Sequence, residues 1–336
     1  MRRAGLLPLH RWLGLALAPF LLIQALTGAL LVLHEATVPH PPPVMARTGQ
    51  FVDAAQAALP GLRVTRLYLP GSTGPTAFAE MSGASGARAY AELDAATARP
   101  LATGALWRFP YRAAVQVHYR LASGTGGLAV VTMVGLALAL SAASGVVFWW
   151  PGAGRLGQAL KVRRSLAGHV RLRQWHRSVG AVAAMLALFS AATGLLLAVP
   201  DLSDALAPAA ATGRAPVFAS EAIDRAVAAA QALHPRAALR DVRFPAADRI
   251  DLNFDAPARN ARAVHVVSVR PSDGAVVKAI AADDNPVLWM KVLALHTGET
   301  FGPAGLALLL AEAGALVFLA VAGVLMWLRR RRKGRA

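Results

Sequence analysis

The sequence contains no cysteine and few acidic residues. Without cysteine the chain cannot form disulfides, hold an iron–sulfur cluster through thiolates or attach a c-type haem through thioethers. Any haem must therefore be held non-covalently by other ligands. Asp and Glu number only 18 against 35 Lys and Arg, which gives a formal net charge of +17. Such a charge indicates a nucleic-acid partner or, where it clusters beside apolar segments, a membrane topology signal.

Long apolar runs are abundant instead. Hydrophobic residues make up 56% of the 336 residues, more than a soluble domain of this size normally buries. Crossing about 30 Å of hydrocarbon takes roughly 20 residues of helix. The first run is too long for the apolar core of a signal peptide. The sequence therefore predicts an integral membrane protein in a lipid bilayer, with spans at Leu13 to Leu33, Leu128 to Trp150, Val179 to Val199 and Gly305 to Leu328.

The basic residues gather in three clusters beside these spans, at residues 2–11, 155–173 and 329–335. Because positively charged loops stay in the cytoplasm, both termini are expected inside and both long polar segments outside. This placement accounts for the positive charge, so we expect no nucleic-acid partner.

Two short motifs are set aside. Residues 152–157 fit a dinucleotide pattern, but they follow a predicted membrane helix instead of a strand, and no acidic residue occurs from there to Pro200. We therefore expect no flavin or NAD site. The serines within 71–74 and 82–86 lie in glycine-rich stretches that predict turns, without the pattern of a nucleophile elbow.

The two halves of the chain repeat the same spacings. In the helix that opens each half, a His-Arg pair is followed by Thr-Gly, the threonine standing 17 residues after the histidine; these residues recur at an offset of 166. In the helix that closes each half, a glycine follows a histidine by 27 residues, and these recur at an offset of 178. The matched residues are His10-Arg11 with Thr27-Gly28, His176-Arg177 with Thr193-Gly194, His118 with Gly145 and His296 with Gly323.

The predicted fold is an integral membrane α-helical protein with four transmembrane helices as two parallel repeats, each a helix, an outer domain and a helix. Each outer domain is expected to be α+β, with a helix such as Phe51 to Ala58 followed by strands. In the second copy we expect Ser220 to be the helix N-cap. The expected order is helix 1–34, outer domain 35–126, helix 127–150, basic loop 151–175, helix 176–200, outer domain 201–302, helix 303–328 and basic tail 329–336.

Histidines near the helix ends form the candidate site. Two imidazoles from facing helices commonly hold haem iron, which is then saturated and suited to electron transfer. The repeat places His10 and His176 at the cytoplasmic level and His118 and His296 at the outer level, so two stacked b-type haems are expected. The alternative to haem ligation is that these histidines lie at the membrane interface and bind no metal. Neighbouring and reserve candidates are Arg11 and Arg177 for the haem propionates, and His34 as a reserve ligand.

Glu312 is the clear carboxylate inside a predicted membrane helix. A buried carboxylate is unfavourable unless it is paired or protonated. It could relay protons, bond a ligand imidazole or face water.

The repeated residues resemble those of the PepSY-associated transmembrane family of bacterial inner-membrane proteins, over nearly the whole chain. Residues 295–302, Leu-His-Thr-Gly-Glu-Thr-Phe-Gly, leading to Gly323, resemble its last helix. The outer segments resemble PepSY domains, with Asp94 and Asp273 near the typical acid-turn positions. The second copy departs from the family at Arg270-Pro271, where the usual acid is missing.

The resemblance implies iron-regulated membrane proteins, among them ferrisiderophore reductases that carry two b-type haems. The expected function is a dihaem reductase of the bacterial inner membrane with two periplasmic domains. It would move electrons from a separate donor, a quinol or a cytoplasmic reductase, to a periplasmic ferric siderophore or similar iron chelate. The alternative is a non-catalytic PepSY binding or regulatory protein without haem. A transporter of an iron complex is disfavoured, because four helices with a single internal carboxylate give little material for alternating access.

Overall fold

The computed structural model describes residues 3–37, 45–71, 74–207, 216–257, 259–260 and 262–333. Arg2 and the end of the basic tail from Gly334 on lie outside this range. The chain divides into two compact units. The membrane unit comprises Met1–Leu33, Ala114–Ala207 and Leu295–Ala336, and the sheet unit comprises His34–Ala113 and Pro208–Ala294. Each sequence half thus contributes to both units.

Four long helices build the membrane unit: α1 (Arg3–Thr37), α4 (Gly124–Trp149), α6 (Gly168–Leu206) and α9 (Gly302–Lys333). Each contains an apolar span long enough to cross a bilayer. The four predicted membrane helices are therefore confirmed. The shorter elements are α3 (Pro110–Arg120), which ends in this unit, and η2 (Ala153–Arg155), α5 (Leu156–Leu160) and η3 (Glu299–Phe301).

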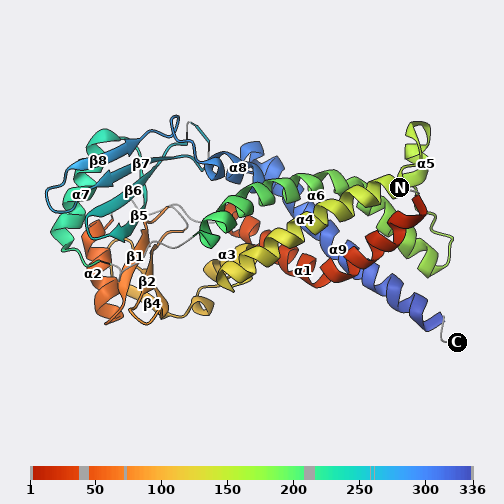
Figure 1. The fold of residues 1–336 in the computed structure, drawn as a ribbon, viewed down its shortest axis with the longest axis horizontal. Coiled ribbons are helices and arrows are strands. Elements are labelled where there is room, and N and C mark those ends of the chain that lie inside the picture. Colours follow the sequence, from red (N-terminus) through yellow and green to blue (C-terminus); the bar gives the residue numbers. More distant parts are fainter. Residues whose placement is uncertain are drawn as a thin grey trace. The chain divides into compact units, whose positions relative to one another are not determined.

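Small side chains let the membrane helices approach closely. Helix α6 packs against both α4 and α9, with Ala183, Ala187 and Ala191 buried on its surface; Figure 1 shows these helices running alongside one another. Without water to drive helices together, such close van der Waals packing is a main source of association in a bilayer. Large apolar side chains such as Met185 are exposed on the outside, as lipid contact requires.

An eight-stranded antiparallel sheet forms the second unit, with strand order β4-β3-β2-β1-β5-β6-β7-β8. Helices α2 (Thr48–Ala58) and α7 (Ser220–Leu233) pack together over it, while α8 (Leu288–His296) leads back toward the last membrane helix. The strands are β1 (Arg63–Tyr68), β2 (Ala77–Ser82), β3 (Arg88–Leu93), β4 (Pro100–Gly104), β5 (Leu239–Ala246), β6 (Arg249–Asp255), β7 (Val264–Val269) and β8 (Val276–Ile280), with η1 (Leu106–Arg108) after β4.

The sheet joins the two outer segments, because β1 of the first pairs with β5 of the second. One hydrophobic core serves both: Phe51 and Leu67 from the first segment and Ile223 and Phe254 from the second are completely buried in it. The segments expected as separate domains are thus held in one unit by a shared sheet and a shared core. Edge-to-edge pairing also leaves fewer unpaired strand edges.

Local structure in the sheet unit follows the sequence closely, with one exception. The helix over residues 51–58 and the turn at 82–86 are confirmed, the latter by a hydrogen bond from the Gly83 amide to the Ala87 carbonyl. The expected N-cap at Ser220 is wrong, because Ala219 is the N-cap of α7. The Ser220 hydroxyl instead donates to the carboxylate of Asp53 on α2, so it links the two helices. Ser72 and Thr73 lie outside the described residues.

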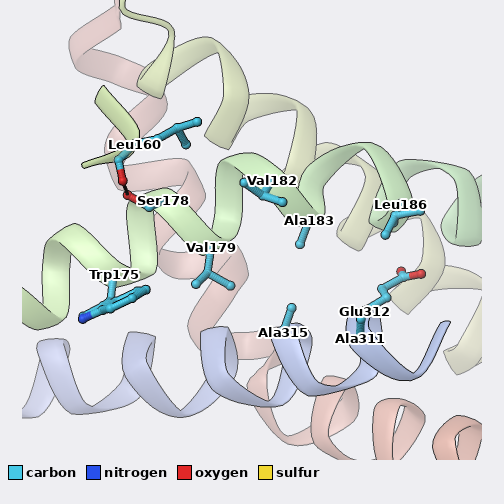
Figure 2. A pocket seen from close by; sticks show the side chains of 10 residues that line it. All are labelled: Leu160, Trp175, Ser178, Val179, Val182, Ala183, Leu186, Ala311, Glu312 and Ala315. Carbon is cyan, nitrogen blue, oxygen red and sulfur yellow. Dashed lines mark hydrogen bonds between the residues drawn. The ribbon is translucent and has the colours of Figure 1, made fainter. Parts of the chain in front are cut away.

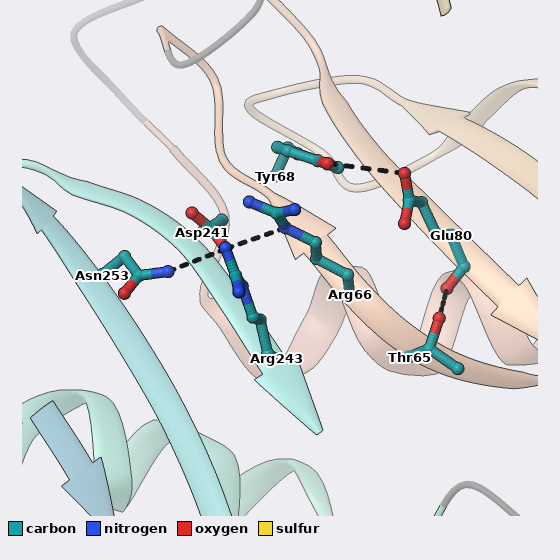
Figure 3. Close-up of polar contacts among 7 residues, drawn as sticks. All are labelled: Thr65, Arg66, Tyr68, Glu80, Asp241, Arg243 and Asn253. Atoms are coloured by element: carbon teal, nitrogen blue, oxygen red, sulfur yellow. Dashed lines mark hydrogen bonds and ion pairs between the residues drawn. The ribbon is translucent and has the colours of Figure 1, made fainter. Parts of the chain in front are cut away.

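A buried carboxylate stabilises the junction of β1 and β5. Asp241 is only 2% exposed and accepts hydrogen bonds from Arg66 Nε at 2.9 Å, Arg243 Nε at 3.1 Å and Asn253 Nδ2 at 3.1 Å. Figure 3 shows these groups, which come from β1, β5 and β6, converging on Asp241. Burial alone would raise the pKa of Asp241, but the two guanidinium groups outweigh it and lower the pKa below its ordinary value.

We expect Asp241→Ala to destabilise the sheet unit by about 3 kcal/mol, because it breaks a buried pair and leaves Arg66 and Asn253 without their acceptor. Hydrogen exchange of the β1 and β5 amides in the detergent-solubilised protein measures this loss. Since the folded pKa is lowered, the contribution of Asp241 is present above its unfolded pKa of about 3.9 and is lost as pH falls through the folded value. The exposed Asp283→Asn is the control; equal effects of both variants would contradict the prediction.

Candidate functional site

Two pairs of histidines lie in the membrane unit, and each pair takes one histidine from each sequence half. The first, called the α3–α8 pair, consists of His118 at the end of α3 and His296 at the end of α8. Their ring centres are 6.4 Å apart, with 49° between the ring planes. Two imidazoles bound at about 2 Å on opposite sides of one metal ion would have ring centres roughly 6 Å apart. The spacing therefore fits one metal between the rings.

Hydrogen bonds fix the tautomer of this pair. His118 Nδ1 lies 3.1 Å from both Thr27 Oγ1 and the Gln24 carbonyl, and His296 Nδ1 lies 2.9 Å from Thr193 Oγ1. Each threonine hydroxyl donates its own proton to a carbonyl of its helix, so it accepts from the imidazole. Nδ1 of each ring is therefore the donor, and Nε2 keeps the lone pair that a metal needs. Metal-bound histidines usually have such a partner on the other nitrogen.

The repeated glycines make room for the histidines. A Cβ built on Gly28 would lie 3.1 Å from His118 Cε1, and one on Gly194 would lie 3.4 Å from His296 Cε1. On the other helices, a Cβ on Gly145 would lie 3.1 Å from His10 Cε1 and one on Gly323 would lie 3.8 Å from His176 Cε1. Each of the four repeated glycines thus faces one repeated histidine. In the Thr-Gly motif the threonine hydroxyl accepts a hydrogen bond from the histidine ring, and the glycine leaves space for the ring because it has no Cβ.

The second pair, called the α1–α6 pair, consists of His10 on α1 and His176 on α6, which occupy matching positions of the repeat. His10 Nδ1 donates to the Ser141 carbonyl at 3.0 Å, with Ser144 Oγ at 3.4 Å. His176 Nδ1 is buried, and no hydrogen-bond partner for it occurs among the described residues. The matching positions in the second half are Leu319 and Ala322, which offer no hydroxyl. Sequence reasoning missed both serines, although Ser144 directly precedes the repeated Gly145.

The other candidate residues from the sequence, two arginines, His34 and Glu312, have different surroundings. Arg11 has a buried Nε that lacks a partner in the described part of the chain, whereas Arg177 Nη2 donates to the Ala159 carbonyl at 3.0 Å. His34 stacks on Tyr111 with ring centres 3.8 Å apart, so it belongs to neither pair. Glu312 is 4% exposed and accepts a hydrogen bond from Ser190 Oγ at 2.8 Å. Within the described ranges, no three His, Asp or Glu side chains form a candidate ion site.

Adding a methyl group at Gly28 tests the role of the Thr-Gly motif. We expect Gly28→Ala to displace the His118 ring and to weaken binding of a group held by that ring roughly 10- to 100-fold, since supporting contacts of metal ligands typically contribute this much. The ratio of haem absorbance to protein measures the effect. Gly14→Ala is the matched control, because a Cβ there meets nothing within 4 Å and alanine favours a helix. Equal haem content in the two variants would contradict the assignment.

Four membrane-spanning helices joined to an antiparallel sheet define a membrane protein with a PepSY-like domain. The model of the PepSY-associated TM region family matches residues 7–330, nearly the whole chain, and the protein belongs to this family. The resemblance seen in the sequence is thereby confirmed. A search of curated proteins finds no match.

Proposed function

We propose that the protein is a dihaem b-type reductase that passes electrons across the bacterial inner membrane to a ferric siderophore or similar chelate. The observation that carries this proposal is the α3–α8 pair, with rings 6.4 Å apart and both Nδ1 atoms engaged. His118 and His296 would hold one haem, and His10 and His176 the other. Bound haem iron would supply one-electron transfer.

The residues of the site would position the haem and saturate its iron. Hydrogen bonds from Nδ1 keep the rings of His118, His296 and His10 oriented with Nε2 free. Two imidazoles for each iron would leave no position for oxygen chemistry, which would favour electron transfer. The buried Nε of Arg11, beside His10 in the sequence, would be satisfied by a haem propionate.

The basic clusters support an orientation with both termini in the cytoplasm and the sheet unit in the periplasm. Electrons would come from a separate donor, a quinol or a cytoplasmic reductase. They would leave for a ferric chelate, and reduction would weaken the hold of hard oxygen ligands on the iron.

The sheet unit has a surface suited to an anionic chelate. Leu67 of β1 lies in the core, so its neighbours Arg66 and Tyr68 lie on the other face of the strand. The guanidinium groups of Arg66 and Arg112 lie 4.2 Å and 3.9 Å from the Tyr68 ring centre. Arg66 is paired with Asp241, so Arg112 would supply the positive charge beside the aromatic ring, an arrangement that favours an anionic or aromatic ligand.

Reconstituted protein tests the proposal. Proteoliposomes receive a ferric hydroxamate chelate and a dye that traps ferrous iron on the side of the sheet unit, and a membrane-permeant reductant is supplied. We expect ferrous iron to form at a rate that depends on the protein. A rate equal to that of empty liposomes would contradict the proposal.

A further inference from the structure

A cavity in the membrane unit lies between α6 and α9, and Glu312 is part of its lining. Its volume is about 300 Å³, and its lining is almost entirely apolar. Figure 2 shows Glu312 reaching from α9 toward α6 at one end of the cavity, with Trp175 at the other end. The cavity is large enough for the ring of a small lipid-soluble molecule, since ligand pockets begin at about this size.

The residues that line the cavity differ in exposure. Trp175 is 48% exposed and Val182 69%, so this part of the lining faces the lipid. Glu312 is 4% exposed and Ala183 5%. Glu312 stands 13 residues into the span Glu299–Arg331, so it lies roughly 20 Å of helix from the nearer end. A ligand that reaches Glu312 must therefore travel through the hydrocarbon rather than through water.

Glu312 has unused hydrogen-bonding capacity. Ser190 Oγ donates to Oε2, but Oε1 is buried and has no partner within the part of the chain that the structure describes. A buried polar atom left in this state is unfavourable in a membrane. A ligand with a hydroxyl group would satisfy it.

Comparison of the two sequence halves shows that the fold does not require this carboxylate or this cavity. At the repeat offsets, Glu312 corresponds to Val134 and Ala183 corresponds to Leu17. Both Val134 and Leu17 are buried in one hydrophobic cluster of α1, α4 and α9. The first half thus has apolar side chains, Leu17 and Val134, at these two positions. The second half has the smaller Ala183 and the carboxylate of Glu312 there. Such a departure at a membrane-buried position indicates function.

Ser190 connects the cavity with the α3–α8 pair. Its hydroxyl bonds Glu312, while its carbonyl accepts a hydrogen bond from the His296 ring. A molecule that is hydrogen-bonded to Glu312 would therefore be connected through Ser190 to His296, a proposed haem ligand.

We propose that this cavity binds the ring of a hydroquinone, with Glu312 accepting a hydrogen bond from a ring hydroxyl. The inference rests on the proposed function and names its donor. In becoming a quinone, the hydroquinone loses two electrons and two protons. Glu312 would take one proton on its free oxygen and release it to solvent before it takes the second, and the two haems that the histidine pairs would hold would each accept one electron.

Binding of decylubiquinone to the full-length protein in quinone-free nanodiscs tests the proposal without reference to activity. Quenching of tryptophan fluorescence reports binding, and an excess of decanol shows whether the ring or only the tail is recognised. We expect saturable binding that decanol does not displace. Glu312→Gln, which keeps the shape, and Ala183→Leu, which copies the first half, should each weaken it at least tenfold.

Glu299→Gln is the matched control, since Glu299 begins the same span but does not line the cavity; it should bind as the unaltered protein does. Absence of saturable binding, or unchanged affinity in Glu312→Gln, would overturn the inference. Because the assay does not require haem, a protein that binds the quinone but carries no haem contradicts only the proposed function. A haem protein that reduces chelate but binds no quinone contradicts only the inference.

Discussion

Replacing either histidine of the α3–α8 pair is expected to reduce the haem content from two per chain to one. His118→Ala and His296→Ala each remove one of the two imidazoles, whose rings lie 6.4 Å apart. The one remaining imidazole cannot saturate the haem iron. The helix of the replaced histidine would also lose its bond to the iron. His10→Ala and His176→Ala should remove the other haem. Pyridine haemochrome assays on purified protein measure the stoichiometry.

Histidines outside the pairs provide the controls for this result. His34 stacks on Tyr111 and His169 lies exposed at the start of α6, so His34→Ala and His169→Ala should retain two haems. A loss of haem in His34→Ala with full haem in His118→Ala would show that the reserve ligand, not the α3–α8 pair, holds the iron.

Variants that keep one haem should nevertheless lose reduction of the ferric chelate. Each histidine pair joins one helix from each sequence half, and we propose that electrons pass through both pairs in series. Loss of either haem interrupts this path, so His10→Ala and His296→Ala should each fall to the rate of empty liposomes. The trapped-ferrous-iron assay in proteoliposomes measures the rate.

The spectrum of the remaining haem shows that these variants are folded. The haem that is left in His10→Ala should keep the low-spin spectrum of two imidazole ligands, since its own pair is intact. Substantial chelate reduction by both single-haem variants would contradict electron transfer in series. If the protein still performed its role in the cell after His10→Ala or His296→Ala, this result would favour a non-catalytic binding or regulatory protein.

Much of the membrane unit could be predicted from the sequence, because in a bilayer length and apolarity alone define a spanning helix. The four spans are confirmed, and the repeat placed Gly28 and Gly194 at matching positions before their role was visible. The repeat placed His118 and His296 at the same outer level and left the pairing of the histidines open, and both residues precede their apolar runs. The structure places each at the end of a separate short helix, α3 or α8.

Other features depend on contacts far apart in the sequence. The bond from His10 to Ser141 joins residues 131 positions apart, and no local pattern marks it. The pairing of β1 with β5 likewise joins two segments far apart in the sequence, and the Arg66–Asp241 ion pair lies across it. Ser220 has the residue type of an N-cap, but a carboxylate on the neighbouring helix takes its hydroxyl. Tertiary partners decide these positions, so sequence periodicity does not reveal them.

The absorption spectrum of the detergent-purified protein, before and after dithionite, tests the central claim most directly. The paired histidines predict a low-spin b-type spectrum, with a reduced α band and two haems per chain that acid acetone extracts completely, since no cysteine can attach them. Protein that folds and purifies without any haem band, even when produced with added haemin, would contradict the account.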